Sequence, residues 1–144
     1  MVAFNNINDF VEHLAEGAHD LDTHQLTIAL SNTAPASETS DPSADGNGLL
    51  ANVTQAAYTF LSTRNITLSS SAQTSGTYTL ALTDLVLTST GGSTGPFRYV
   101  YCYNDGTTVL TDPLINYYDY GSALTLNDGE SLTIDYGASF FTIA

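Results

Sequence analysis

Apolar and polar residues alternate along most of the chain, beginning at Gln25. In QLTIALSN, residues 25–32, large aliphatic side chains stand at every second position from Leu26 to Leu30. Successive side chains of a strand point to opposite faces, so this stretch predicts a strand with one buried face. The same alternation predicts further strands at residues 57–62, 65–69, 77–82, 85–90, 97–103, 114–118, 123–126, 131–135 and 140–143. Many short strands at near-regular spacing predict a mainly β fold, a β-sandwich or jelly roll.

Turn sequences separate the expected strands. Asn-Asp-Gly occurs twice, at 104–106 and 127–129, and is typical of tight hairpins because Asn and Gly tolerate positive φ. Residues 33–48, TAPASETSDPSADGNG, hold two prolines, two glycines and otherwise only small or polar side chains. They predict a loop of unusual length, either mobile or ordered by a neighbouring element.

The N-terminal residues follow a different period. In FNNINDFVEHLAEGA, residues 4–18, apolar side chains recur at three- and four-residue spacing, which predicts one short amphipathic helix. Asp9, Glu12 and Glu16 fall largely off the apolar stripe. We expect the helix to pack against the β domain; the alternative is a detachable arm that binds a partner.

The length of 144 residues suits one domain. We therefore predict an N-terminal helix within residues 1–22, followed by a single β-sandwich domain in residues 23–144 with its long loop at 33–48. Cys102 is the only cysteine, so no intramolecular disulfide can form. We interpret it as a small apolar residue on one face of a strand.

The formal net charge is −13, with no lysine and only two arginines, Arg64 and Arg98. Such a field repels phosphate groups, so we expect neither a nucleic-acid partner nor an anionic membrane partner. No apolar run approaches the length of a membrane span, and the N-terminus lacks the basic start and apolar centre of a signal peptide. The chain is expected to be soluble and made in the cytoplasm.

Motifs for catalysis and metal binding are not found. His13, His19 and His24 do not share the i, i+4 face that a metal pair on a helix needs, and we interpret them as solvated surface histidines. The loop DPSADGNG, residues 41–48, lacks the ligand series of an EF-hand and is interpreted as flexible and solvated. No serine lies in a G-x-S-x-G elbow. We expect no enzyme activity, no cofactor and no metal.

The most aromatic strand candidate lies within GPFRYVYCYND, residues 95–105. Alternation places an aromatic row on one face and Arg98 on the other. Arg98 has three interpretations: it pairs with a nearby carboxylate, lies over a tyrosine ring, or anchors a subunit contact. The sequence does not decide whether a paired carboxylate belongs to the same chain. The aromatic row consists of Phe97, Tyr99, Tyr101 and Tyr103.

Three more tyrosines lie close together in the next strand candidate, within DPLINYYDYGS. They form either a contact face or a row that packs along the sheet with its hydroxyl groups in water. The candidate subunit or capsid interface therefore consists of Arg98, Tyr99, Tyr101, Tyr117, Tyr118 and Tyr120.

Three stretches of the chain resemble small virion structural proteins of tailed bacteriophages, of the head decoration (cement) type. They are LTIALSNTAP, SSAQTSGTYTLALTDLVLTSTGGSTGPFRYVYCYND and DPLINYYDYGSALTLNDGESLTIDY. The resemblance covers roughly residues 25–136, and its most particular part is GPFRYVYCYND followed by DPL and YDYGS.

The resemblance implies a β-sandwich or jelly-roll subunit that forms a homotrimer on the outer capsid shell. Its partner would be the major capsid protein, and its location the capsid surface of the virion after synthesis in the host bacterial cytoplasm. A tail or fibre component with a receptor-binding role would use the same architecture and is the alternative. A polysaccharide-degrading tail enzyme would need a cleft with converging carboxylates.

Overall fold

The computed structural model describes residues 2–144 and is mainly β, with antiparallel sheets and one α-helix near the N-terminus. This confirms the predicted fold class. Met1, the first residue of the predicted 1–22 segment, lies outside the described residues. The strands are Phe4–Asn6 (β1), Leu26–Ser31 (β2), Thr67–Thr74 (β3), Thr77–Thr83 (β4), Leu85–Thr88 (β5), Thr94–Asn104 (β6), Leu114–Leu126 (β7), Ser131–Ile134 (β8) and Phe141–Ile143 (β9). The helices are Asp9–Ala15 (α1) and the 3₁₀ turns Pro35–Ser37 (η1) and Leu50–Asn52 (η2).

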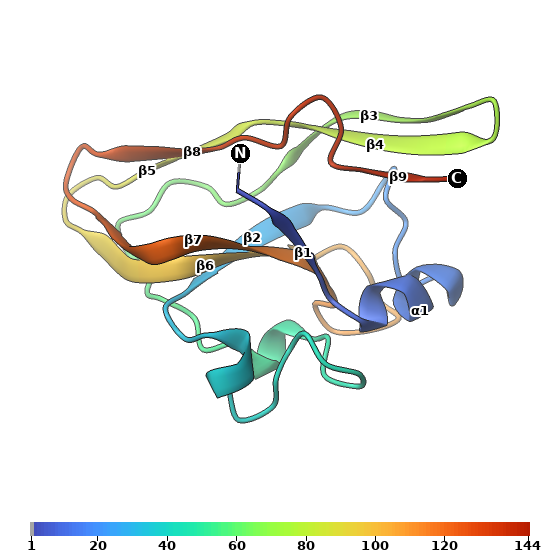
Figure 1. The fold of residues 1–144 in the computed structure, drawn as a ribbon. Helices are drawn as coiled ribbons and strands as arrows, with labels where there is room; N and C mark the ends of the chain where they lie inside the picture. The colour runs from blue at the N-terminus through green and yellow to red at the C-terminus, as the bar shows by residue number, and fades with distance from the viewer. Residues whose placement is uncertain (1) are drawn as a thin grey trace.

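The strands form two layers. One layer is a four-stranded sheet in the order β1-β7-β6-β2. The other consists of the three-stranded sheet β3-β4-β9 and the two-stranded sheet β5-β8, which lie above the first layer in Figure 1. All pairings are antiparallel. This arrangement buries one face of each sheet against the other layer.

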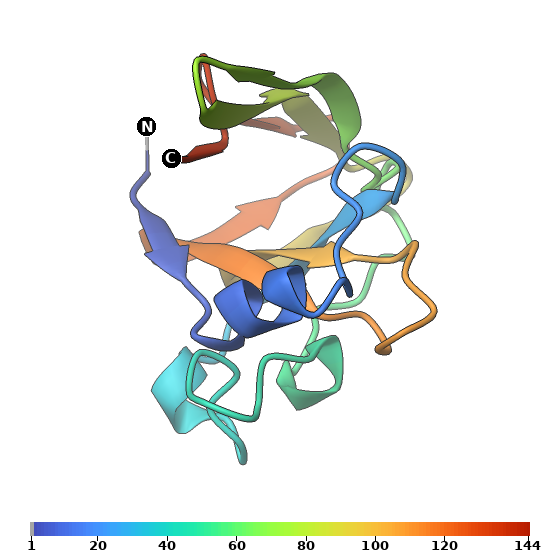
Figure 2. The same cartoon turned by 90° about the vertical axis from the view of Figure 1, so that its right-hand side faces the viewer.

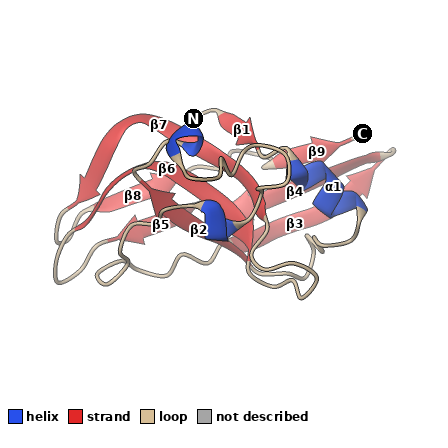
Figure 3. Cartoon of the chain, turned by 90° about the horizontal axis from the view of Figure 1, so that it is seen from below, coloured by secondary structure: helices blue, strands red, loops and turns tan. Residues whose placement is uncertain are grey.

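The main core lies between the two layers, and it takes the inward residues of both. Its largest fully buried members are Ile28, Leu30, Leu80, Leu87, Phe97, Val100, Ile115, Ile134 and Tyr136. A second, smaller core lies on the opposite face of the four-stranded sheet, beneath the segment that contains η1 and η2. Figure 3, seen from below, shows these two turns in front of that sheet. The sheet is therefore covered on both faces.

The N-terminal segment differs from its prediction. Residues 4–18 do not form one helix, because Phe4–Asn6 is a strand that pairs with β7 and α1 begins only at Asp9. The ring of Phe4 packs edge-on against Phe140 and Tyr118, and this burial favours the extended conformation. The segment is thus part of the sheet and packs on the domain, as expected, rather than forming a detachable arm.

Several strand and turn predictions also differ. Residues 57–62 form no strand; Leu61 makes only an isolated bridge with Ser89. Residues 114–118 and 123–126 belong to the single long strand β7. Neither Asn-Asp-Gly makes a tight hairpin: residues 105–113 form a long connection between β6 and β7, and the second turn joins β7 to β8 in another sheet.

The long loop at 33–48 is ordered by a neighbouring element, which is one of its two expected states. The buried Asp9 of α1 accepts hydrogen bonds from the backbone N–H groups of Gly46 and Gly48, each 2.8 Å long. Asn8 adds an N–H bond to the Ser43 carbonyl, 3.2 Å long. A Cβ at Gly48 would lie 2.8 Å from the Asp9 Cβ, so only glycine fits this contact. The interpretation of residues 41–48 as a flexible solvated loop was wrong.

Candidate interaction site

The strands β6 and β7 carry all six candidate interface residues, and their register decides where each side chain points. Tyr99 faces Asp119 and Tyr101 faces Tyr117 across the two strands. Between Phe97 and Tyr99 the register shifts, because the pairing moves from Leu124 to Asp119 on β7. This bulge turns Phe97 into the main core while Tyr99 lies in the second core. The predicted aromatic row is therefore split between two faces.

Tyr99, Tyr101 and Tyr103 are buried in the second core, under the segment that carries η1 and η2. Tyr117 packs beside them, with its ring centroid 5.5 Å from that of Tyr101 and 6.4 Å from that of Tyr99. Burial raises the pKa of the Tyr101 hydroxyl well above its ordinary value. Tyr99 and Tyr101 thus lie inside the protein and are not on the surface where the interface was predicted.

The three tyrosines of β7 do not share one face. Tyr117 lies on the side of the second core, whereas Tyr118 is buried in the main core and Tyr120 is half-buried against it. Burial raises the pKa of both Tyr118 and Tyr120. Of the two interpretations, packing along the sheet describes their positions better than a common contact face.

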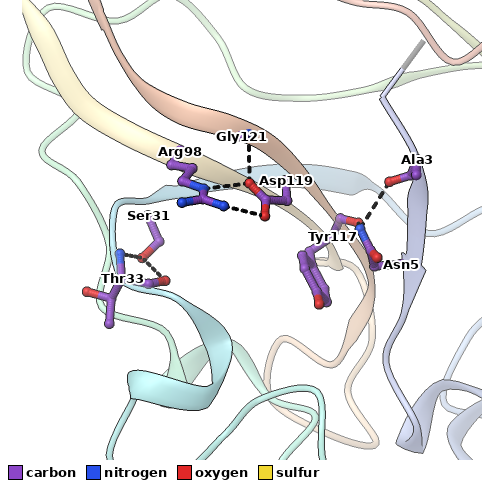
Figure 4. A network of polar contacts seen from close by, with 8 residues as sticks. All are labelled: Ala3, Asn5, Ser31, Thr33, Arg98, Tyr117, Asp119 and Gly121. Carbon is purple, nitrogen blue, oxygen red and sulfur yellow. Dashed lines mark hydrogen bonds and ion pairs between the residues drawn. The ribbon is translucent and has the colours of Figure 1, made fainter.

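Arg98 and Asp119 form a two-pronged ion pair within the chain (Figure 4). Arg98 Nε donates to Oδ1 of Asp119 at 2.6 Å, and Nη2 donates to Oδ2 at 2.8 Å. Asp119 Oδ1 also accepts from the Gly121 N–H, and the guanidinium lies 5.2 Å from the ring centroid of Tyr99. The hydrogen bonds to Arg98 are the main cause that lowers the pKa of Asp119. Arg98 therefore both pairs with a carboxylate and lies over a tyrosine ring, which are two of its three interpretations.

We expect the Arg98→Ala variant to have a lower urea midpoint than the wild type, because it loses both hydrogen bonds next to the β6 bulge. Both side chains are partly exposed, so the loss should be modest and should shrink in about 1 M salt, where surface charges are screened. Urea unfolding of Arg98→Ala, Asp119→Ala and the double variant measures the coupling. Strictly additive losses would show that the ion pair contributes nothing.

Arg64, the other cation, is also bound within the chain. It donates to the Ile28 carbonyl, and its guanidinium lies 3.9 Å from the ring centroid of Tyr58. The Tyr58 hydroxyl accepts from the Leu30 N–H at 3.0 Å, and the N–H of Ala56 donates to the Leu30 carbonyl at 2.7 Å. These contacts cover the free edge of β2. Both positive side chains are therefore held by their own chain.

His19 is buried and is not the solvated surface residue that the sequence analysis predicted, whereas His13 and His24 are half-buried. Asn104, fully buried at the end of β6, places its Nδ2 3.2 Å from His19 Nδ1 and 2.9 Å from His24 Nδ1. Its Oδ1 accepts from the Gly106 N–H, which leaves Nδ2 as the donor toward both rings. His19 is only 6% exposed, and burial, followed by the nearby His13 and His24, lowers its pKa from 6.5 to about 4. Spacing along the chain gives no signal of this convergence.

Reactive groups are otherwise sparse in the described structure. Among residues 2–144, no group of three or more His, Cys, Asp or Glu side chains is arranged to hold a metal ion. Within the same range, no helix is long and apolar enough to cross a membrane. Cys102 is fully buried, and burial raises the pKa of its thiol, which keeps it protonated.

No protein-family model matches the chain, and no curated protein or solved structure matches it either.

Proposed function

We propose that the protein is a non-enzymatic structural protein of a phage virion, a capsid decoration (cement) protein that binds the outer shell and stabilises the assembled head. One observation carries the proposal: the side chains best suited to binding or catalysis make their contacts within the chain. Arg98 is paired within the chain, Tyr99 and Tyr101 are buried, and His19 lies against Asn104. Such a molecule suits a scaffold that binds and stiffens an assembly.

The negative net charge of the chain favours a partner with a basic or neutral surface. The chain carries a net charge of −13, and both of its arginines are held internally, so a docking surface on the major capsid protein is favoured where it offers positive charge. We further propose that the protein binds as a homotrimer at the capsid surface of the virion. Several linked contacts would then add their free energies, and binding only to the assembled shell would stabilise that state.

The test is binding to emptied, expanded heads of the phage that encodes the protein, with unexpanded heads as the control. Light scattering after gel filtration gives the oligomeric mass. We expect a trimer that saturates expanded heads, is not retained by unexpanded ones, and raises the temperature at which filled heads release DNA. A monomer that binds host cells and not heads would favour the tail or fibre alternative, and release of sugars from a host polysaccharide would favour an enzyme.

A further inference from the structure

An apolar groove runs between β1, α1 and β9. It has a volume of about 560 Å³, and its lining comes from all three elements. Val11 of α1 is 70% exposed and Ile143 of β9 is 42% exposed at this groove. Rings that pack together form its wall, with centroids 5.4 Å apart for the pair Phe10 and Phe141. We call this hollow the β9 groove.

Among the residues that the structure describes, strand edges without a partner border the β9 groove. β9 is the outermost strand of its sheet, and β1 is the outermost strand of the four-stranded sheet. Figures 1 and 2 show both strands on the same side of the molecule as α1. By contrast, the outer edge of β2 is covered by the segment around Tyr58 and Arg64. An unpaired edge beside an apolar groove suits the addition of an extended strand.

The β9 groove continues into an acidic end. A second hollow, of about 510 Å³, shares Leu14 and Ile143 with the first and is lined by Asp20 and Asp22. Both carboxylates are exposed. A hydrogen bond from Thr23 is the main cause that lowers the pKa of Asp20, so this side chain carries its negative charge at neutral pH.

We propose that the β9 groove binds an extended segment of another protein, with apolar side chains between α1 and β9 and a Lys or Arg at the end that meets Asp20 and Asp22. Charge selects this occupant. A second copy of the chain has no lysine, and both of its arginines are already bound within it, so it has no cation to place at Asp20 and Asp22; the proposed trimer therefore uses another surface. A basic segment gains attraction at the acidic end and hydrogen bonds along the β9 edge.

This inference goes beyond the proposed function, because it holds for whichever protein supplies the segment. Head binding and segment binding are measured separately, so either proposal can fail without the other.

The experiment selects binders from a displayed library of random peptides of about eight residues, which extend about 25 Å as a strand. We expect the enriched peptides to alternate apolar residues and to carry Lys or Arg at one end. Titration calorimetry of the synthetic peptide then gives its affinity. Val11→Asp should weaken binding at least about tenfold. The pair Asp20→Asn and Asp22→Asn should remove most of the salt dependence.

Val109→Asp is the matched control, since Val109 is equally apolar, 64% exposed and located in the connection between β6 and β7. Its urea midpoint and that of Val11→Asp should both match the wild type, which separates lost binding from lost folding. Any one of three results overturns the inference: no peptide binds tighter than about 100 µM, acidic peptides are enriched, or Val11→Asp and Val109→Asp lose equal affinity for the peptide.

Discussion

Replacing Asp9 with alanine is expected to lower the free energy of unfolding by about 3–5 kcal/mol, because two hydrogen bonds to a buried carboxylate are lost together. Asp9 is 7% exposed, and its carboxylate accepts from the N–H groups of Gly46 and Gly48. After truncation, the Gly48 N–H is left buried without this partner, and a cavity opens where α1 meets the long loop. Equilibrium unfolding in urea measures the loss.

The control for this prediction is Glu12→Ala, an exposed acid on the same helix. It should change stability by less than about 0.5 kcal/mol. Asp9→Asn is the conservative variant: its amide can accept only one of the two N–H bonds and points a donor at the other, so it should lose most of the same stability. Hydrogen exchange at the Gly46 and Gly48 amides should accelerate in both Asp9 variants. An Asp9→Ala protein as stable as Glu12→Ala would contradict the assignment of Asp9 as the anchor of the loop.

Alternation along the chain predicted most strand positions, because it reports a property of each strand alone. The strand expected at 25–32 is β2, Leu26–Ser31, and the one expected at 97–103 lies within β6. The pattern does not report which strands pair or where a bulge falls. The shift after Phe97 therefore reversed the face of that residue relative to Tyr99.

Contacts between distant residues explain the other differences. Asp9 is 39 positions from Gly48, and Asn104 is 85 positions from His19. Helical spacing placed Asp9 off the apolar stripe correctly, but the loop that covers this side of α1 can be seen only in the folded chain. Likewise, the spacing of the histidines excluded a metal-binding pair on one helix face, but it could not show that His19 and His24 both contact Asn104.

The candidate site was predicted in part. Pairing of Arg98 with a carboxylate was one of its three interpretations, and the partner is Asp119 of the same chain. The sequence predicts Tyr99, Tyr101 and the tyrosines of β7 at an interface because both strand candidates are rich in aromatic residues. The segment around η1 and η2 buries Tyr99 and Tyr101. Its polar composition did not indicate that it would cover the sheet.

The stability of the protein is expected to fall as the pH decreases from 6.5 to about 4, because of His19. Its pKa is lowered from 6.5 to about 4 in the folded protein. In this window the unfolded chain binds a proton that the folded chain does not, so stability rises with pH and is lost on acidification. The full difference corresponds to about 3 kcal/mol. The geometry gives the same sign, since a proton on His19 Nδ1 would face the amide donor of Asn104.

Urea unfolding of the wild type and of His19→Gln at several pH values within this window isolates the contribution of His19. Glutamine does not titrate, so the variant should be less stable at neutral pH and should lose less of its stability on acidification. The pKa values of Asp20 and Asp119 are also lowered, but these groups affect stability in a lower pH range. Their contribution to the free energy of unfolding is lost only as the pH falls below their ordinary pKa of 3.8. Parallel stability curves for the two proteins above that pH would contradict the prediction, because the slope would then arise from groups other than His19.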